Sequence, residues 1–322
     1  MTTLAKGIPV GWLAQPRAES THRFWSTYGH SALDRIMETA PRVDFDDSAR
    51  IVLFSDCHRG DGSRADAFSR NEDLFLGALE HYYREGFSYV EIGDGDELWQ
   101  NSRFRDIRQA HARTFDLLHR FHLGRRLHII VGNHDVQGLR FGQVEKDGMP
   151  TLEGLVLRQV GTGQHILVTH GHQADFKSDR LRLVGKLVVR HIWKRLQLHG
   201  LVHVSSHLDA EGASLAFVER RVADVQQATY KAIERRLMDW VISRQQIVIC
   251  GHTHRPAFPA RGMPAYFNAG SCVNPGYITG LEIQGGDITL VRWCARQGPG
   301  RDGTPHIERQ LLAPPRRLSR LN

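Results

Sequence analysis

The amino-acid sequence predicts an α/β fold that is interrupted by a helical insertion. Apolar strand-like runs alternate with helical patterns from residue 51 onward, and residues 176–245 have helical patterns throughout. Polar clusters follow directly after several of the strand-like runs. Open α/β sheets place their ligand sites where strands end, so these clusters are expected to carry the function.

The expected elements follow one another in a regular order. Strands are predicted at residues 51–55, 89–92, 128–131, 247–250, 266–268 and 277–284, and helices at 74–84 and 105–121. Residues 155–160 and 166–169 flank Gly161-Thr162-Gly163 and predict a hairpin. Gly285-Gly286 predicts a second turn, into a strand at 287–294.

Three regions are expected along the chain. Residues 1–48 are predicted to be a helical N-terminal extension, with helical periodicity over 22–39 that ends at Pro41. Residues 49–296 form the main domain, and the helical insertion 176–245 lies within it. Residues 297–322 are rich in Gly, Pro and Arg, and we predict a disordered tail there.

The composition favours a soluble protein of the cytoplasm. No run reaches the roughly 18–20 apolar residues of a membrane-spanning helix, and the first 20 residues lack the apolar core of a secretory signal. The four cysteines are widely scattered, which is typical of reduced thiols. The net charge of +7 is concentrated in residues 176–200, where seven Lys or Arg face one Asp. Such a concentration predicts an anionic partner.

Five polar clusters are the candidates for chemistry. They are Asp56-Cys57-His58, Gly93-Asp94-Gly95-Asp96-Glu97, Gly132-Asn133-His134-Asp135, His170-Gly171-His172 and Gly251-His252-Thr253-His254. Each cluster alone is a weak signal in a chain with 19 histidines. Five of them in order, each at a strand end, indicate a shared site.

The spacing within the clusters has a physical reason. Residues i and i+2 of an extended strand face the same side, so Asp56 with His58, and His252 with His254, can enter one space. Cys57, between the first pair, is expected to be a structural residue that points away, as is Thr253. Glycines before Asp94, Asn133 and His252 allow tight turns. Mixed imidazole and carboxylate ligands suit Mn, Fe and Zn.

This set of clusters resembles the calcineurin-like metallophosphoesterase superfamily, whose motifs read DxH, GDxx(D/E), GNH(D/E), a histidine often followed by Gly, and GHxH. The resemblance covers about residues 51–275. It implies a four-layer αββα sandwich with two divalent metal ions. It also implies the ligands: Asp56, His58 and His254 for the first ion, Asn133, His170 and His252 for the second, and Asp94 as the bridge.

The same resemblance implies that His134 is the catalytic histidine and that Asp135 orients it. Two divalent ions outweigh the charge of Asp56 and Asp94, so the site favours an anionic, phosphate-containing substrate. Two such ions hold a bridging hydroxide at neutral pH that would attack phosphorus. Mn is the expected metal, with Fe or Zn as alternatives. Glu97 is expected to orient imidazoles.

Four further residues are candidates for substrate contact. Arg59 and Arg64 follow His58 in a polar loop and could grip phosphate oxygens, against the alternative of solvated loop arginines. His172 could touch substrate or support a ligand, and Arg255 follows the last predicted ligand.

The insertion carries a basic amphipathic run at 177–195. Arg182, Lys186, Arg190 and Lys194 recur every four residues, opposite an apolar face. Two interpretations stay open: a cap helix with a solvated basic face, or a surface for anionic lipid or a polyphosphate substrate at the membrane.

A narrower resemblance concerns the substrate. The GDxxELW and GHTHRP runs, together with Asn268–Ser271, are similar to the UDP-2,3-diacylglucosamine pyrophosphatase branch. That similarity implies a pyrophosphate bond in a lipid-linked nucleotide. A nuclease is the main alternative, because related nucleases also have GNHD and the basic run could follow a nucleic-acid backbone. A non-catalytic metal-binding scaffold would lack one or two ligand positions, and none is missing here.

Overall fold

The computed structural model describes residues 30–136, 146–175, 216–299 and 305–321. Its strands are β1 (Arg42–Phe45), β2 (Arg50–Phe54), β3 (Ser88–Ile92), β4 (Leu127–Ile130), β5 (Thr151–Leu152), β6 (Gly154–Gln159), β7 (His165–Thr169), β8 (Ile247–Cys250), β9 (Tyr266–Asn268), β10 (Tyr277–Gln284), β11 (Asp287–Pro299), β12 (Pro305–Leu311) and β13 (Arg316–Arg317). Its labelled helices are η1 (Phe68–Arg70), α2 (Glu72–Arg84), α3 (Phe104–Ala110), α4 (Ala112–Leu123), η2 (His172–Ala174), α7 (Ala216–Arg244) and η4 (Leu318–Arg320), and residues 30–39 are also helical.

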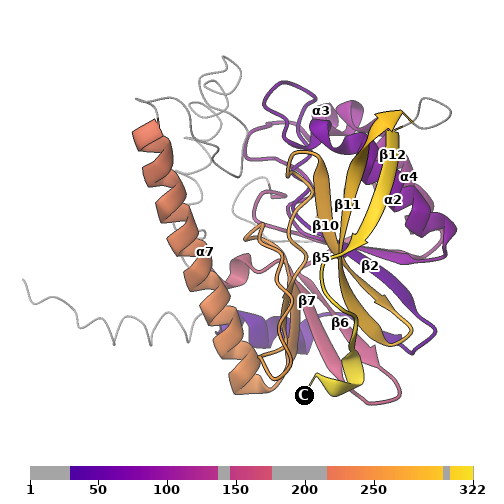
Figure 1. Cartoon of the computed structure of the whole chain (residues 1–322), viewed down its shortest axis with the longest axis vertical. Helices are drawn as coiled ribbons and strands as arrows, with labels where there is room; N and C mark the ends of the chain where they lie inside the picture. Colours follow the sequence, from indigo (N-terminus) through magenta and orange to yellow (C-terminus); the bar gives the residue numbers. More distant parts are fainter. Residues whose placement is uncertain (1–29, 137–145, 176–215, 300–304, 322) are drawn as a thin grey trace, which may run out of the picture.

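Two mixed sheets form the centre of the fold (Figure 1). One sheet has the order β1-β6-β7-β8-β9, and the other has the order β12-β11-β10-β2-β3-β4-β5, with β13 paired to β11. Strands β2, β3 and β4 are parallel, as are β7 and β8. Their carboxyl ends are therefore the positions that can bring the polar clusters together.

The side chains of β2 show why the sheets pack as two layers. Ile51 and Leu53 join the buried cluster between the sheets, whereas Val52 and Phe54 join the cluster under α2 and α4. This alternation is the period of two that a strand buried on both faces requires.

The outer face of the smaller sheet has its own helical cover. Leu33 and Ile36 from helix 30–39, and Leu237 and Trp240 from α7, pack with residues of β7 and β8. The layers therefore run helix, sheet, sheet, helix, which confirms the predicted αββα sandwich.

Helix α7 lies within the expected insertion. It has 29 residues and runs past the edge of the sandwich in Figure 1. The basic run at 177–195 and most of the expected N-terminal extension lie outside the described residues. No described helix is both long enough and apolar enough to span a membrane.

The prediction of a disordered tail at 297–322 is wrong for its described part. Strand β12 pairs antiparallel with β11, and Arg309 forms a bidentate ion pair with the buried Glu282. Tyr82 donates to the same carboxylate. A buried carboxylate needs such partners. The composition of the tail does not reveal that Arg309 is a partner of Glu282.

Two other boundaries differ from expectation. Residues 42–45 of the expected helical extension form β1, which pairs parallel with β6, so they belong to the smaller sheet. The single helix expected at 105–121 is two helices, α3 and α4, which meet at His111. The His111 ring is held by Asp66 at 2.7 Å and Glu72 at 3.2 Å, and these contacts fix the break.

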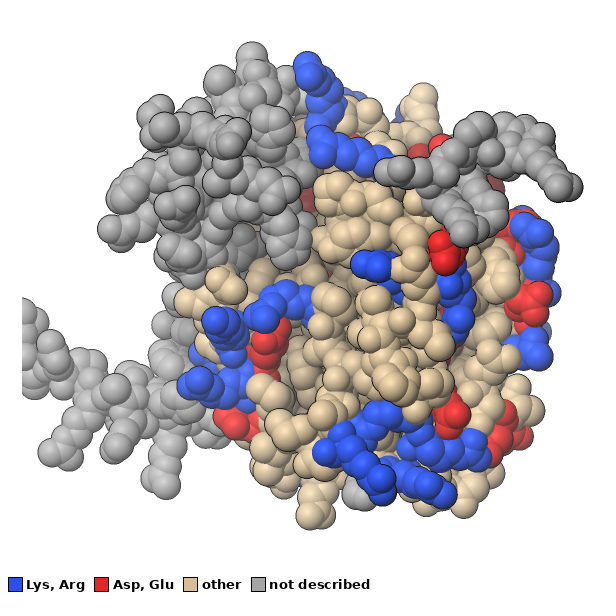
Figure 2. Space-filling model, in the orientation of Figure 1, with Lys and Arg blue, Asp and Glu red and all other residues tan. Residues whose placement is uncertain are grey.

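Basic and acidic side chains are interspersed over the face shown in Figure 2. Many form ion pairs there and elsewhere, such as Arg244 with Asp34 and Arg35 with Glu153. The residues that hold most of the excess positive charge, 176–200, lie outside the described part of the chain.

Candidate metal centre

The predicted ligands come from five loops that follow β2, β3, β4, β7 and β8. All seven lie between one and four residues after the last residue of a strand, as the sequence pattern indicates. Because β2, β3 and β4 are parallel to one another, as are β7 and β8, these loops meet at one edge of the sandwich.

The first group of ligands is Asp56, His58 and His254. The Nε2 atom of His254 lies 3.2 Å from Asp56 Oδ1 and 3.1 Å from His58 Nε2. The Nδ1 atom of His58 lies 2.9 Å from Glu97 Oε2, so a proton on Nδ1 leaves Nε2 as an acceptor. Acceptor atoms that converge in this way suit a cation among them.

The second group is Asp94, His170 and His252. The Nε2 atom of His170 lies 3.1 Å from Asp94 Oδ2, and its Nδ1 atom lies 2.9 Å from the carbonyl oxygen of Ile92. Donation from Nδ1 to that carbonyl again leaves Nε2 directed at the group. The candidate ligand atoms of each group lie within 4.8 Å of one another.

The two groups are neighbours. Asp94 Oδ2, which contacts His170, also lies 3.8 Å from His58 Nε2 in the first group. The Asp94 carboxylate therefore lies between the two groups, and its predicted role as a bridge between two ions stays a prediction.

Buried atoms without hydrogen-bond partners provide a test of whether metal ions fit. Among the described residues, four predicted ligands carry such an atom: Asp56 Oδ1, Asn133 Oδ1, His170 Nε2 and His252 Nε2. Five further buried side-chain atoms among the described residues are in the same state, but these four belong to the two groups or to the neighbouring loop and lie together. The donor set of carboxylates, imidazoles and one amide suits divalent first-row metals, so the residues present fit the expected ions.

The backbone of the ligand loops is strained in a way that sequence spacing did not reveal. Asp56, His58, Asp94, His252 and His254 all have positive φ, between 48° and 69°. This left-handed region is uncommon for residues other than glycine and is concentrated at functional sites. The extended geometry expected for Asp56 and His58 is therefore wrong, because tight turns direct both side chains into one space.

Two glycines are required for close approach. A Cβ atom at Gly132 would lie 2.1 Å from Asp94 Oδ1, and one at Gly251 would lie 1.7 Å from Ser55 Oγ. The predicted tight turns explain Gly93, which has φ of 68°, but at these two positions the reason is space.

Glu97 holds the two imidazoles on either side of it. Its Oε2 lies 2.9 Å from His58 Nδ1, and its Oε1 lies 2.9 Å from His134 Nδ1. The expectation that Glu97 orients imidazoles therefore agrees with the contacts. The indole of Trp99 stacks on His134 from one face.

The prediction that Asp135 orients His134 is wrong. The Asp135 carboxylate accepts hydrogen bonds from the backbone nitrogens of Asp96, at 2.8 Å, and Gly132, at 2.7 Å. It also accepts from Lys146 Nζ at 2.5 Å. Asp135 thus supports the loops beneath the site, and Glu97 has the orienting contact.

The side chain of Arg59 is not available to bind a substrate phosphate. It is fully buried and pairs with both oxygens of Glu91, at 2.7 and 2.8 Å, and with Asp96 at 2.7 Å. Both sequence interpretations, the phosphate contact and the solvated loop residue, are wrong, because the loop after His58 turns inward. Lys146 completes the buried network through Asp96, at 2.9 Å, and Asp135.

The charges of the site favour ionised carboxylates. Burial by itself raises the pKa of Asp56, but the neighbouring imidazoles of His254 and His170 more than offset it and hold the pKa below its usual value. The same balance lowers the pKa of Glu97 through His134 and His58. Burial lowers the pKa of His170, whereas Asp94 and Asp56 raise it to about 9. These carboxylates thus attract cations, whether protons or metals.

The remaining residues that the sequence analysis singled out differ in how buried they are. His172 is buried, and its ring centroid lies 5.5 Å from that of His170. Arg64 is exposed, and Arg255 is 3.5 Å from Glu234 of α7. Cys57 is packed in the core under α2, which agrees with its structural interpretation.

Sequence reasoning missed four residues that contact the site or the buried network beneath it: Trp99, Lys146, Tyr230 and Glu234. Trp99 lies in the same run as Glu97, and its short spacing from Asp94 could have drawn attention to it. Lys146 lies 11 residues after Asp135 and the other two lie in the insertion, and no local pattern marks them.

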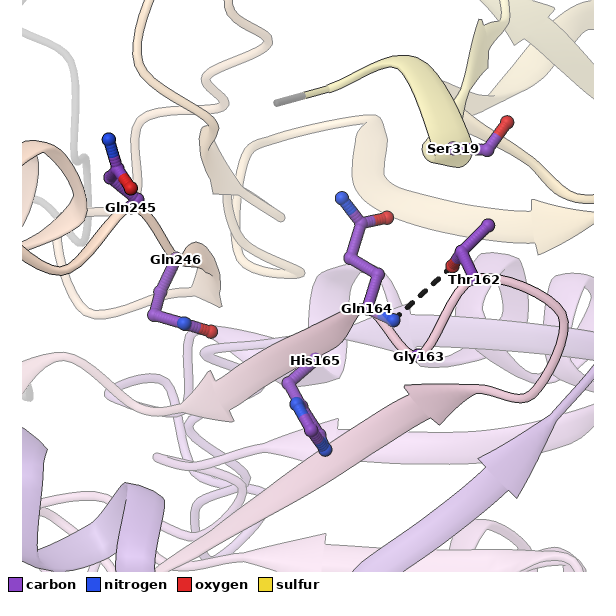
Figure 3. Close-up of a pocket in the computed structure, with 7 residues that line it drawn as sticks. All are labelled: Thr162, Gly163, Gln164, His165, Gln245, Gln246 and Ser319. Atoms are coloured by element: carbon purple, nitrogen blue, oxygen red, sulfur yellow. Dashed lines mark hydrogen bonds between the residues drawn. The ribbon is translucent and has the colours of Figure 1, made fainter.

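The structure also has a polar cavity of about 390 Å³, whose lining residues are drawn in Figure 3. It is lined by Thr162, Gly163, Gln164, His165, Gln245, Gln246 and Ser319. His165 begins β7, and Gln246 precedes β8, so the cavity is at the amino ends of these strands. The metal ligands follow their carboxyl ends, about 16 Å away for a strand of five residues.

Comparisons with known proteins indicate the family to which the chain belongs. No curated protein matches it significantly in sequence. Among solved structures it is similar to Vps29 of Chaetomium thermophilum, with 13% identity, a TM-score of 0.33, and coverage of 82% of this chain and 97% of that one. The family model described as calcineurin-like phosphoesterase matches residues 49–256, which is more than half of the chain and includes every predicted ligand. The chain therefore belongs to the calcineurin-like phosphoesterase family.

Proposed function

We propose that this protein hydrolyses phosphodiester or pyrophosphate bonds with two divalent metal ions. The observation that carries the proposal is the placement of Asp94 between the two ligand groups, 3.1 Å from His170 and 3.8 Å from His58. A single-metal site would not need two adjacent groups of acceptors.

Seven of the site residues would bind the metal ions, and the His134 imidazole would act on the substrate. Asp56, His58 and His254 would hold one ion, Asn133, His170 and His252 the other, with Asp94 shared. When bound, the ions supply Lewis acidity and make water nucleophilic at neutral pH. His134 lies beside the first group, held by Glu97 and Trp99, and its imidazole would donate a proton to the leaving oxygen.

The charge of the site supports an anionic substrate. Metal ions would outweigh the buried carboxylates, so a phosphate group would be attracted into the centre. A small or lipid-linked nucleotide is the substrate class that the similarity to the UDP-2,3-diacylglucosamine pyrophosphatase branch suggests. The basic run at 177–195 is the proposed surface for lipid or phosphate, with manganese as the proposed metal.

The motif residues behind that similarity also have a structural role. Asn268 donates from Nδ2 to the carbonyl oxygen of Gly251 at 2.7 Å and to Thr253 Oγ1 at 3.2 Å. The run at Asn268–Ser271 therefore braces the loop that carries His252 and His254. Support of the ligand loop would serve hydrolysis of any phosphoester, so these residues do not identify the substrate, and an experiment must do so.

A substrate screen of the Mn-loaded protein tests the proposal. Nucleotides, cyclic nucleotides, UDP-linked lipids and single- and double-stranded DNA would be incubated with wild type and with Asp94→Asn. We expect turnover of a small or lipid-linked phosphodiester or pyrophosphate, and none by the variant. Hydrolysis of DNA in preference, with steep salt dependence, would establish the nuclease alternative. Bound metal without turnover of any substrate would establish the scaffold alternative.

The role of His134 has its own test. His134→Ala removes the ring between Glu97 and Trp99 but leaves both ligand groups intact. We expect the variant to retain its metal and to lose turnover by about 10² or more. Loss of the metals together with the activity would contradict the assigned role.

A further inference from the structure

Helix α7 of the insertion contacts four consecutive residues of the metal-binding loop. Tyr230 and Glu234 lie one turn apart on α7, so their side chains share one face of the helix. The loop they contact is 252–255, which contains the predicted ligands His252 and His254.

The Tyr230 ring packs against both ligand imidazoles. Its centroid lies 6.4 Å from that of His254, with the planes inclined by 21°, and 6.3 Å from that of His252, with the planes at 65°. These are the offset-stacked and edge-to-face arrangements that aromatic pairs prefer.

Glu234 holds the residues between and after those histidines. Thr253 donates from Oγ1 to Glu234 Oε1 at 3.2 Å, and Arg255 lies 3.5 Å from Glu234 Oε2. Thr253 is fully buried, so its contact with α7 is made inside the protein. The loop is thereby held at its two ligands by an aromatic ring and at the residues between and after them by a carboxylate.

The carboxyl-terminal half of α7 is itself well anchored. Ile233, Leu237 and Trp240 are buried in the cluster outside the smaller sheet. Arg236 donates to the carbonyl oxygen of Ala174 at 2.8 Å, four residues beyond His170. The helix therefore has a rigid base from which it can fix loops that carry ligands of both groups.

We propose that Tyr230 and Glu234 are positioning residues for His252 and His254, so that the helical insertion sets the metal affinity of the centre. The ligand loop has positive φ at His252, 69°, and at His254, 55°. A loop in that conformation persists only when its surroundings hold it, and α7 supplies two of the holding side chains. This inference rests on the proposed function only in its assumption that the centre binds divalent ions.

Metal affinity of full-length variants tests this inference. Mn²⁺ binding would be titrated by the loss of the free-ion electron paramagnetic resonance signal for wild type, Tyr230→Ala, Tyr230→Phe, Glu234→Ala and Glu234→Gln. We expect the alanine variants to bind Mn²⁺ about 10–100-fold more weakly, as groups that orient ligands usually do. Tyr230→Phe keeps the ring and Glu234→Gln keeps an acceptor for Thr253, so both should recover most of the affinity.

Two further measurements separate positioning from unfolding. Circular dichroism should show folded alanine variants, and the visible spectrum of the Co²⁺-loaded protein should shift, because that spectrum reports ligand geometry. Arg235→Ala, an exposed neighbour on α7, is the matched control and should leave both unchanged.

The outcomes distinguish this inference from the proposed function. Folded alanine variants with wild-type Mn²⁺ affinity and Co²⁺ spectrum would overturn the role of α7, while active wild type would leave the proposed function standing. Wild type that binds no Mn²⁺ would overturn both.

Discussion

The indole of Trp99 stacks on the imidazole of His134, with ring centroids 4.2 Å apart and ring planes inclined by 19°. The same indole donates from Nε1 to the backbone carbonyl oxygen of Asn133 at 2.6 Å. Trp99 therefore contacts a proposed metal ligand through the backbone and its neighbour, the proposed catalytic group, through the ring. One side chain fixes both the loop and the imidazole.

Removal of this indole should impair turnover more than binding. We expect Trp99→Leu to lower kcat by about 10–10²-fold, because a catalytic ring displaced by about 1 Å loses its alignment. Trp99→Phe should lose less, since it keeps an aromatic face for His134. Steady-state kinetics on the substrate found in the screen checks this, and an unchanged kcat in the leucine variant would contradict it.

Glu97 should matter to metal affinity as well as to turnover. Its two carboxylate oxygens accept from His58 and His134, whereas a glutamine side chain in its place would have only one such acceptor. We expect Glu97→Gln to weaken Mn²⁺ binding and turnover by about 10–100-fold each. Isothermal titration and kinetics would measure the two effects. Glu38→Gln, at an exposed position on helix 30–39, should change neither.

Lys146 should be important for stability. Its ammonium group is buried among Asp135, Asp96 and Glu91, and burial alone would lower its pKa, but these carboxylates raise it. Lys146→Met would leave Arg59 as the one cation, within the described part of the chain, for the carboxylates of this network and Asp135 without its ion pair, so we expect a loss of about 3–5 kcal/mol in the free energy of unfolding. Urea denaturation would measure it. Lys231→Met, at an exposed site on α7, should have almost no effect, and an equal loss there would contradict the explanation.

His111 should make stability depend on pH. Burial lowers the pKa of His111, but Asp66 and Glu72 more than compensate and raise it from 6.5 to about 9. The folded-state pKa is above the unfolded value, so the stabilisation is full below pH 6.5 and is lost as the pH rises through 9. It amounts to at most about 3 kcal/mol.

The comparison with His111→Gln isolates that contribution. Urea denaturation at pH 6.5 and pH 9.5 should show a larger difference between wild type and variant at the lower pH. A difference that stays constant between the two pH values would rule out this role for His111.

The sequence predicts the location of those site residues that directly follow a strand. Asp56, Asp94 and His252 could be placed together because parallel strands bring their following loops to one edge. The local backbone could not be predicted, because positive φ at these residues is stabilised by contacts from other loops. Glu97 and Asp135 could not be told apart as partners of His134, since both belong to loops that contain glycine and only packing decides which carboxylate reaches the ring.

Side chains of the buried network were the least predictable. Arg59 follows a ligand in a polar loop, and its pattern is that of an exposed residue, yet Glu91 and Asp96 draw it into the core. Its partners come from β3 and the loop that follows β3, and Lys146 comes from further along the chain. Such a cluster is specified by tertiary proximity alone.

The position of β10 limits how the protein can be shortened. The family match ends at residue 256, but β10 pairs with β2 in the middle of the larger sheet, and β11 and β12 follow it outward. A recombinant fragment cut at the limits of the match would expose a row of backbone donors and acceptors along β2, as well as the apolar faces that β10 covers. Expression of residues 49–256 alone should therefore yield aggregated material, and useful boundaries for crystallisation must include the strands up to β12.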